Sequence, residues 1–192
     1  DFVKNMVAGV GAVDLALLVV AADDGWMPQT EEHLQILSYL GVTRGVVALT
    51  KADLVQDTAV RVKEISDQLR NSPFVGADII PVSTKTGAGL DDLKTALTTV
   101  VDQIPPHENH NQPRLAVDRI FTVQGIGTVV TGTLTGGTLQ KGQTVLTHPP
   151  GRETRVRGLQ SHNREQEVAQ PGTRTAINLA GLSRDAVPRG AT

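Results

Sequence analysis

The segment Val46-Val47-Ala48-Leu49-Thr50-Lys51-Ala52-Asp53 decides the fold of the first half of the chain. Its apolar residues predict a strand from Gly45 to Thr50 that is buried on both faces of a parallel sheet. A threonine, a lysine and an aspartate follow this apolar run at once. Open α/β sheets bind ligands at the carboxyl ends of their strands, so we expect these polar residues to lie at a binding site.

Strands and helices alternate on both sides of this segment. The continuous apolar run at 15–21 predicts another strand buried on both faces, and Ile79-Ile80-Pro81-Val82 predicts a third strand. Helical spacing of apolar residues predicts four helices, near 2–10, from Thr30 to 40, from Asp57 to 69, and at 90–97. Such alternation is typical of a parallel sheet covered by helices.

The second half of the chain has a different texture. A polar, proline-bounded stretch at 105–113 predicts a linker. Short β-branched runs separated by glycines follow it, at 128–135, 144–147, 154–159 and 173–179. These runs predict a small antiparallel β-barrel over 114–192. We therefore expect an α/β domain over 1–104, a linker, and a barrel.

Composition and charge narrow the classes of function. The chain has no cysteine, which excludes disulfides, thiolate metal sites and cysteine nucleophiles. It has no apolar run near the roughly 18 residues of a membrane span, and no histidine spacing typical of a metal site, so we expect neither a membrane nor a metal ligand set. Net charge is 8 − 15 = −7 over 1–110 and 10 − 5 = +5 over 111–192. Nine of the ten basic residues after 110 are arginines, which suits a polyanion such as RNA.

The chemistry of the Thr50 to Asp53 segment suits a purine. A carboxylate such as Asp53 accepts hydrogen bonds from the N1 and N2 groups of guanine, which adenine does not offer. Lys51 can lay its aliphatic stem along the purine face while its charged head reaches solvent. After the next strand, Ser83-Thr84-Lys85 takes a similar edge position, where a backbone N–H donates to guanine O6. The alternative for the first segment is a strand end with a capping aspartate.

These two segments resemble the N-K-x-D and S-A-K motifs of the GTPase superfamily, with Thr50 in place of the usual Asn. A threonine lacks the amide, so the departure implies a weaker contact to guanine N7 and weaker bracing of the loop. The stretch at 1–6 looks like the helix after the D-x-x-G motif of translational GTPases. The stretch at 24–33 is similar to their G-x-x-P-Q-T-x-E-H segment.

A phosphate-binding G-x-x-x-x-G-K-[ST] loop does not occur in the sequence, and in the family the catalytic histidine precedes the point where this chain begins. We therefore expect a fragment, a truncated P-loop GTPase-type domain with no catalytic residue. Alone it should neither hydrolyse GTP nor bind it well.

The barrel half carries its own resemblance. No helix follows Gly125-Ile126-Gly127, which excludes a dinucleotide site, and 123–132 instead looks like the V-x-G-x-G-T-V-V-T-G run of the second domain of translational GTPases. Three stretches are similar to selenocysteine-specific elongation factors: 115–121, 156–162 and 174–181. The resemblance implies that Asp118, Arg119 and Arg174 belong to the pocket for the amino acid on the transfer RNA.

A physical reason supports two arginines in such a pocket. A selenol is more acidic than a thiol, whose free pKa is about 8.5, so selenocysteine is largely anionic at neutral pH while serine is not. Serine would leave desolvated arginines without a counter-charge. However, Asp118 and Arg119 are adjacent, and neighbours in a regular strand point to opposite faces. Both can reach one pocket only through a bulge or a strand end.

For the intact protein the resemblance implies GTP-dependent delivery of selenocysteinyl transfer RNA to the ribosome. GTP or GDP with Mg²⁺ would be the cofactor, an mRNA hairpin read by a C-terminal region would be a further partner, and the cytoplasm would be the location. Two alternatives stay open. One is a translational GTPase that carries an ordinary aminoacyl or initiator transfer RNA, and the other is a nucleotide-independent RNA-binding module.

Overall fold

The computed structural model describes residues 13–149 and 151–192, and these form two compact units. One unit spans Val13–Pro105, and Pro106–Thr192 belongs to the other. The helix predicted over 2–10 lies outside the described residues. Within the described part of the chain, no helix is long and apolar enough to cross a bilayer.

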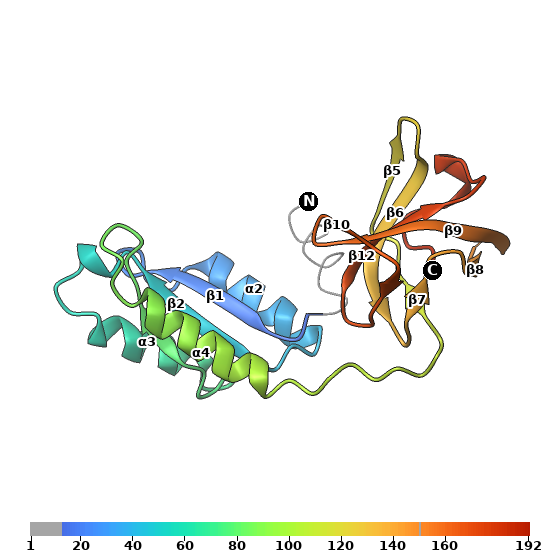
Figure 1. Cartoon of the computed structure of the whole chain (residues 1–192). Coiled ribbons are helices and arrows are strands. Elements are labelled where there is room, and N and C mark those ends of the chain that lie inside the picture. The colour runs from blue at the N-terminus through green and yellow to red at the C-terminus, as the bar shows by residue number, and fades with distance from the viewer. Residues whose placement is uncertain (1–12, 150) are drawn as a thin grey trace. The chain divides into compact units, whose positions relative to one another are not determined.

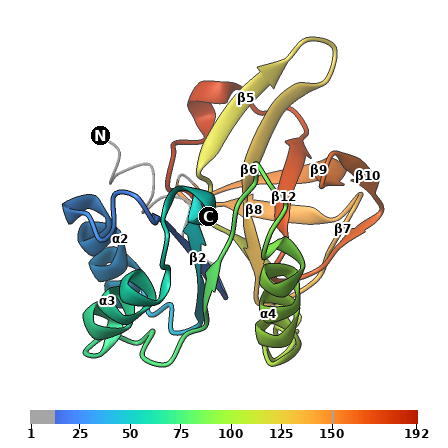
Figure 2. The same ribbon diagram turned by 90° about the vertical axis from the view of Figure 1, so that its left-hand side faces the viewer.

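The first unit is a three-stranded parallel sheet between helices. Its elements are β1 (Ala16–Ala21), α2 (Pro28–Tyr39), β2 (Gly45–Thr50), the 3₁₀ turn η1 (Ala52–Leu54), α3 (Ala59–Leu69), β3 (Ile79–Pro81) and α4 (Leu90–Asp102). The strand order is β1-β2-β3, and both neighbouring pairs are parallel. Helices α2 and α3 cover one face and α4 covers the other (Figures 1 and 2). The predicted α/β fold class is confirmed.

The two longest strands of this sheet, β1 and β2, differ in how many of their faces are buried. β2 is the middle strand, and Val46 to Leu49 is buried on both faces, as predicted. For β1 the prediction of burial on both faces was wrong, because Leu17 and Val19 are 44% and 61% exposed while Leu18 and Val20 are buried. β1 is an edge strand of the described sheet, and α4 packs mainly against β2. Among the described elements, none covers the face of β1 that carries Leu17 and Val19.

Helix α2 begins two residues before the predicted capping residue Thr30. Pro28 is the first helical residue, since its fixed φ suits that position and its missing N–H would have no partner there. The Thr30 N–H donates to the Met27 carbonyl at 2.9 Å, inside the first turn. The Asp57 carboxylate, as predicted, lies at the start of α3 and accepts the Ala59 N–H at 2.8 Å.

The second unit is a curled antiparallel sheet. Its elements are β4 (Arg114–Leu115), β5 (Arg119–Val123), β6 (Gly127–Thr135), β7 (Leu139–Gln140), β8 (Thr144–Thr147), β9 (Arg152–Ser161), β10 (Arg164–Gln166), β11 (Val168–Ala169), β12 (Arg174–Leu179) and the 3₁₀ turn η2 (Arg184–Ala186). The strand order is β10-β9-β12-β6-β4, with β5 paired to β6, β8 paired to β9, and β11 paired to β7. This confirms the predicted antiparallel, barrel-type architecture.

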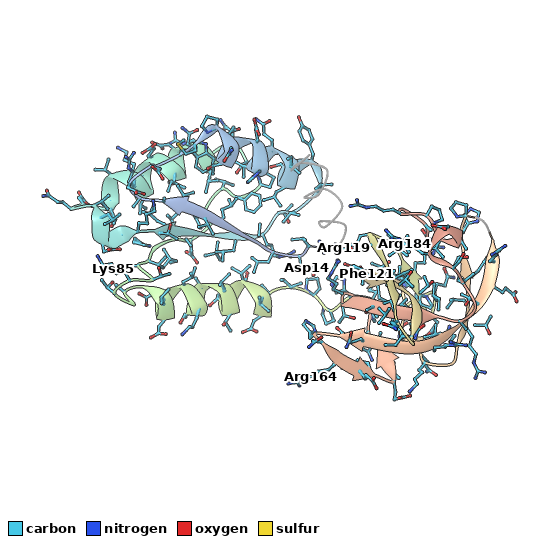
Figure 3. The ribbon with its side chains drawn as sticks, turned by 90° about the horizontal axis from the view of Figure 1, so that it is seen from above. Asp14, Lys85, Arg119, Phe121, Arg164 and Arg184 are labelled. Carbon is cyan, nitrogen blue, oxygen red and sulfur yellow. The ribbon has the colours of Figure 1, made fainter. Side chains whose placement is uncertain are left out.

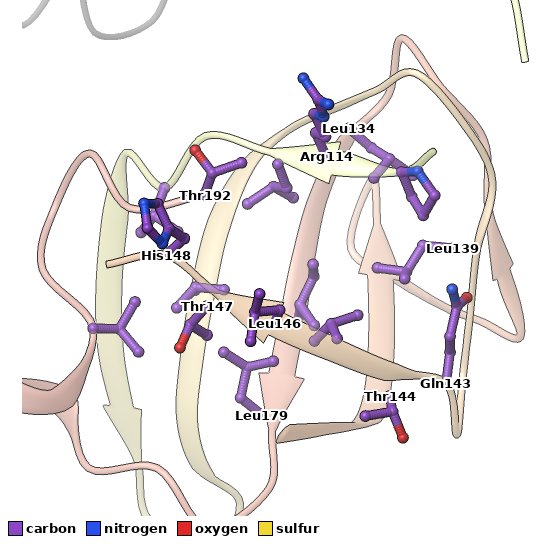
Figure 4. A pocket seen from close by; sticks show the side chains of 17 residues that line it. Arg114, Leu134, Leu139, Gln143, Thr144, Leu146, Thr147, His148, Leu179 and Thr192 are labelled. Atoms are coloured by element: carbon purple, nitrogen blue, oxygen red, sulfur yellow. The ribbon is translucent and has the colours of Figure 1, made fainter. Parts of the chain in front are cut away.

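Apolar side chains from one face of these strands form the core of the second unit. Twelve residues are buried there: Leu115, Val117, Val130, Leu134, Leu139, Val156, Leu159, Ala169, Ile177, Leu179, Val187 and Ala191. A mostly apolar hollow of about 340 Å³ lies within the curl, and Figure 4 shows Leu134, Leu139 and Leu179 among the side chains that line it. The opposite, outer face of the sheet carries polar and apolar side chains, Thr131 and Arg174 together with Val129 and Ala176.

The β5–β6 hairpin explains the glycines at 125 and 127. Gly125 turns the chain with φ of 79°, which a side chain would strain, and the Ile126 N–H donates to the Val123 carbonyl at 3.1 Å. A strand follows this turn, in agreement with the exclusion of a dinucleotide site.

Candidate functional site

The candidate guanine site lies where β1, β2 and β3 end together. The Ala22 N–H donates to the Thr50 carbonyl at 2.8 Å, which joins the ends of β1 and β2. The Ala52 N–H donates to the Val82 carbonyl at 3.1 Å, which joins the loop after β2 to the end of β3. The segment from Thr50 to Asp53 is thus held at the carboxyl edge of the sheet, where ligands of such sheets bind.

Thr50 is tied to the neighbouring strand. Its hydroxyl donates to the Val20 carbonyl at 3.3 Å. A hydroxyl has one proton, so Thr50 in this arrangement has no donor left for guanine N7. The threonine therefore braces the loop but does not replace the amide of an asparagine.

Lys51 and Asp53 present different groups to solvent. Lys51 has a left-handed backbone, with φ of 56°, and caps η1. Its ammonium lies 2.8 Å from one carboxylate oxygen of Asp23 and 3.6 Å from Asp24. The hydrogen bond from Lys51 lowers the pKa of Asp23, and the same bond raises the pKa of Lys51. The Asp53 carboxylate is exposed, and no described residue bonds to it, so both oxygens can accept.

The loop after β3 contains the backbone N–H groups that were predicted to donate to guanine O6, and not all of them are free. Ser83 is buried, and its N–H already donates to the Ala88 carbonyl at 2.9 Å while its hydroxyl accepts the Thr86 N–H at 3.2 Å. Ser83 therefore shapes the loop and has no free backbone donor. Thr84 and Lys85 are exposed, and no hydrogen bond from their N–H groups forms within the described structure. Lys85 projects from this end of the unit (Figure 3).

A second candidate site lies on the outer face of the curled sheet, around Asp118. The carboxylate accepts two N–H groups of Arg174, at 2.5 and 3.0 Å, and the Thr131 hydroxyl at 2.8 Å. The side chain of Asp118 is 13% exposed and that of Arg174 is 50% exposed. Burial raises the pKa of Asp118, but the hydrogen bonds and the charges of Arg174 and Arg119 outweigh it and hold the pKa below its ordinary value.

The strand register shows how Asp118 and Arg119 share one face. Asp118 precedes β5, which begins at Arg119, so a strand end resolves the expected conflict. Arg119 and Ala176 are both register partners of Thr131 and lie on its face. Arg174, two residues before Ala176, points to the same side. The structure brings Asp118 and Arg174 into contact, while Arg119 is exposed and forms no hydrogen bond or ion pair with any described residue.

Two depressions lie on the second unit, one that includes residues of this cluster and one that includes Ala176 on the same sheet face. One, of about 390 Å³, is lined by apolar residues that include Val129 and Ala176, by Gln160, and by the charged residues Lys141, Arg157 and Glu165. Asn178 lies there with a buried oxygen that has no hydrogen-bond partner within the described residues. The other, of about 490 Å³, is lined by three arginines, Arg119, Arg184 and Arg189, and by Asp118 and Asp185. Figure 3 shows Arg119, Phe121 and Arg184 close together.

Sequence reasoning missed several of these residues. The partners Asp23 and Thr131 were not predicted, because they meet Lys51 and Asp118 only after distant segments pair. Asn178 was detectable, since the period of two along β12 places it on the face of Arg174.

Known protein families match both units. The elongation factor Tu GTP binding domain matches residues 1–106, and elongation factor Tu domain 2 matches residues 127–192. The chain belongs to the elongation factor Tu family of GTP-binding proteins. The predicted membership in the translational GTPases is thereby confirmed.

Selenocysteine-specific factors are among the relatives of this family member. The selenocysteine-specific elongation factor of Desulfomicrobium baculatum is 47% identical over 98% of this chain, and that of Escherichia coli (strain K12) is 41% identical over 98%. Elongation factor Tu 2 of Streptomyces avermitilis is 38% identical over 99%. The chain spans 30% and 31% of the length of the first two relatives.

Solved structures show the same likeness. A bacterial selenocysteine-specific elongation factor, EF-Sec, matches with a TM-score of 0.90 at 34% identity, over 98% of this chain and 33% of its own. The SelB factor of Methanococcus maripaludis in complex with the GTP analogue GppNHp matches with a TM-score of 0.87 at 30% identity, over 96% of this chain and 42% of its own. The predicted resemblance to selenocysteine-specific factors is confirmed.

Proposed function

We propose that the intact protein delivers selenocysteinyl transfer RNA to the ribosome in a GTP-dependent manner. Residues 1–104 would belong to its guanine-nucleotide domain, and residues 114–192 would form the barrel that holds the aminoacyl end. The observation that carries the proposal is the cluster of Asp118, Arg119 and Arg174 on one face of the barrel. A neutral side chain such as that of serine gains nothing from two arginines, whereas an anionic selenolate is attracted by them.

In the first unit, the available groups fit guanine. Asp53 offers two free carboxylate oxygens for N1 and N2, and the Thr84 and Lys85 N–H groups are available to O6. Lys51 offers its stem to the face of the ring. GTP with Mg²⁺ would supply the phosphate group whose hydrolysis acts as the release switch of the intact protein.

In the second unit, the two arginines take different parts. Arg174 is already neutralised by Asp118, so an incoming anion must share this guanidinium with a carboxylate. Arg119 forms no ion pair or hydrogen bond with any described residue, although its charge acts on the nearby Asp118. Discrimination against serine therefore falls mainly on Arg119, because a neutral hydroxyl would cover it without compensating its charge.

The depression beside the cluster suits the last nucleotide of an RNA. Among its lining residues, Val129 and Ala176 offer apolar surface to a nucleobase. The exposed Gln160 amide in the same lining can accept a hydrogen bond from an exocyclic amine. The second depression carries Arg119, Arg184 and Arg189, whose guanidinium groups suit phosphates. A transfer RNA end offers base, phosphate and amino acid together.

The rival with direct support is a factor for ordinary aminoacyl transfer RNA, because elongation factor Tu 2 also matches the whole chain. The two readings differ in what Arg119 recognises. If Arg119 binds the amino acid, its removal weakens only the selenocysteinyl form. If Arg119 binds RNA phosphate, its removal weakens every aminoacyl form equally.

The test uses the full-length protein with GTP and one transfer RNA body charged with either selenocysteine or serine. We expect Arg119→Ala to weaken binding of the selenocysteinyl form at least about tenfold and the seryl form less than about threefold. Arg164→Ala is the control, since Arg164 is an exposed arginine on β10, outside both depressions (Figure 3). Equal weakening of both forms by Arg119→Ala would contradict the proposal.

A further inference from the structure

We propose that Asp23 is a positioning residue for Lys51, which orders the lysine stem across the carboxyl edge of the sheet before a nucleotide binds. The proposal deepens the function above and rests on guanine binding at this edge. Asp23 itself would not touch the base. It would act through the side chain that does.

The geometry of the ion pair carries the proposal. Asp23 follows β1 and Lys51 follows β2, and the last pair in this parallel register is Ala21 with Thr50. The lysine side chain therefore crosses from one loop to the next to reach the Asp23 carboxylate at 2.8 Å. Because its head is held at the end of β1, the stem lies along the edge where the guanine ring would rest.

Both oxygens of Asp23 are engaged. One accepts Lys51, and the other accepts the N–H of Asp24 at 3.1 Å. These two bonds fix the orientation of the carboxylate. Asp24 lies farther from the lysine, at 3.6 Å, and its side chain is 60% exposed. Asp23 is thus the main holder of the lysine, and Asp24 offers a matched control.

The loop that carries Asp23 is itself anchored. The Gly25 N–H donates to the Ala21 carbonyl at 2.8 Å, which closes a tight turn around Asp23. From α3, Arg61 donates to the Ala22 carbonyl at 3.1 Å and pairs with Glu64 at 2.7 Å. The ion pair therefore connects Lys51 to a fixed point of the fold.

The expected effect is on nucleotide retention and not on folding. A free lysine samples many rotamers, and ordering it opposes ligand binding. When Asp23 orders the stem in advance, the nucleotide does not bear this cost. An exposed ion pair contributes little to the stability of the fold, so loss of the pair should leave the melting temperature nearly unchanged.

The experiment measures the GDP dissociation rate of the full-length protein by chasing a fluorescent GDP with excess unlabelled GDP. We expect Asp23→Asn to raise this rate about fivefold to tenfold, the range of one coupled pair. Asp24→Asn should stay within about twofold of the wild type. Asp23→Glu keeps the charge, so its GDP dissociation rate should be close to that of the wild type.

Repeating the Asp23→Asn substitution in a variant that lacks the Lys51 ammonium shows whether Asp23 acts through this lysine. Lys51→Met keeps an aliphatic stem and removes the ammonium, so Asp23→Asn should add nothing in this variant. The proposal is overturned if Asp23→Asn leaves the rate unchanged, or if it has the same effect with Met at position 51. Equal dissociation rates of GDP and ADP from the wild type would instead overturn the guanine site on which the inference rests.

Discussion

The Thr50 hydroxyl limits the contacts that guanine would make in the proposed site. Its proton is donated to the Val20 carbonyl, so N7 of the base should lack a side-chain donor at this position. We expect 7-deaza-GDP, which has a C–H in place of N7, to bind the full-length protein within about twofold of GDP. Competition binding with the two nucleotides measures the ratio. A loss of tenfold or more would show that the threonine turns to N7 when the base arrives.

The Asp118 carboxylate makes the stability of the barrel unit depend on pH. Its pKa lies below its ordinary value, because the bonds and charges from Arg174, Thr131 and Arg119 outweigh burial. A depressed pKa contributes stability that is present above the unfolded value of about 3.9 and is lost as pH falls through the folded pKa. We expect Asp118→Asn to lower the free energy of unfolding by about 1 kcal/mol at pH 7 and by less at pH 3. The effect is modest because Arg174 is half exposed.

Urea unfolding of the wild type and of Asp118→Asn at both pH values measures this difference. Thr131→Ser, which retains the hydroxyl donor to Asp118, is the control and should follow the pH profile of the wild type. If Asp118→Asn lowered the free energy of unfolding equally at pH 7 and at pH 3, the ionised carboxylate would not be the source of the stabilisation.

At the scale of elements, two glycines within strands of the barrel should respond differently to a methyl group. A Cβ on Gly132, in β6, would collide with the Ala116 carbonyl oxygen and the Leu115 side chain. A Cβ on Gly158, in β9, would meet only the Asn178 Cβ, at 3.9 Å. We expect Gly132→Ala to destabilise the unit by about 2 to 3 kcal/mol and Gly158→Ala to change stability by no more than about 1 kcal/mol.

Chemical unfolding of the two variants provides the comparison. Similar effects would mean that β4 does not approach β6 as closely as the register of Leu115 with Leu134 requires. The packing of β4 against β6 would then be less close than in the structure described above.

Sequence patterns predict these elements only where local chemistry is sufficient. β2 agrees with its predicted limits because it is buried on both faces and ends at polar residues. An apolar run alone does not reveal how many faces are covered, so β1 was predicted buried on both faces although Leu17 and Val19 are exposed. The short strands β7 and β11 have two residues each and form only by pairing with one another. Their local sequence carries too little signal to predict them.

The same distinction applies to the candidate sites. The positions of Thr50 to Asp53 and of Ser83 to Lys85 at the sheet edge could be predicted, since each segment directly follows a strand. Which groups remain free could not be predicted, because it depends on distant partners. The Ala88 carbonyl accepts the N–H of Ser83, and the Asp118 carboxylate accepts hydrogen bonds from the guanidinium of Arg174. These contacts arise only when the chain is folded.

For the whole molecule, charge and site chemistry agree. The acidic half, with a net charge of 8 − 15 = −7, carries the edge suited to guanine, and the basic half, with 10 − 5 = +5, carries the arginine cluster suited to an RNA end. This division suits a protein in which one unit reads the nucleotide and the other holds a polyanion. The two halves match two successive domains of the elongation factor Tu family.

The central proposal is that the intact protein recognises the amino acid on its transfer RNA. The most direct measurement is the half-life of the aminoacyl ester, on one transfer RNA body, with the full-length protein and GTP. We expect the selenocysteinyl ester to be protected at least about tenfold, the seryl ester less than about twofold, and neither when GDP replaces GTP. Equal protection of both esters would contradict selenocysteine recognition and leave a general carrier of aminoacyl transfer RNA.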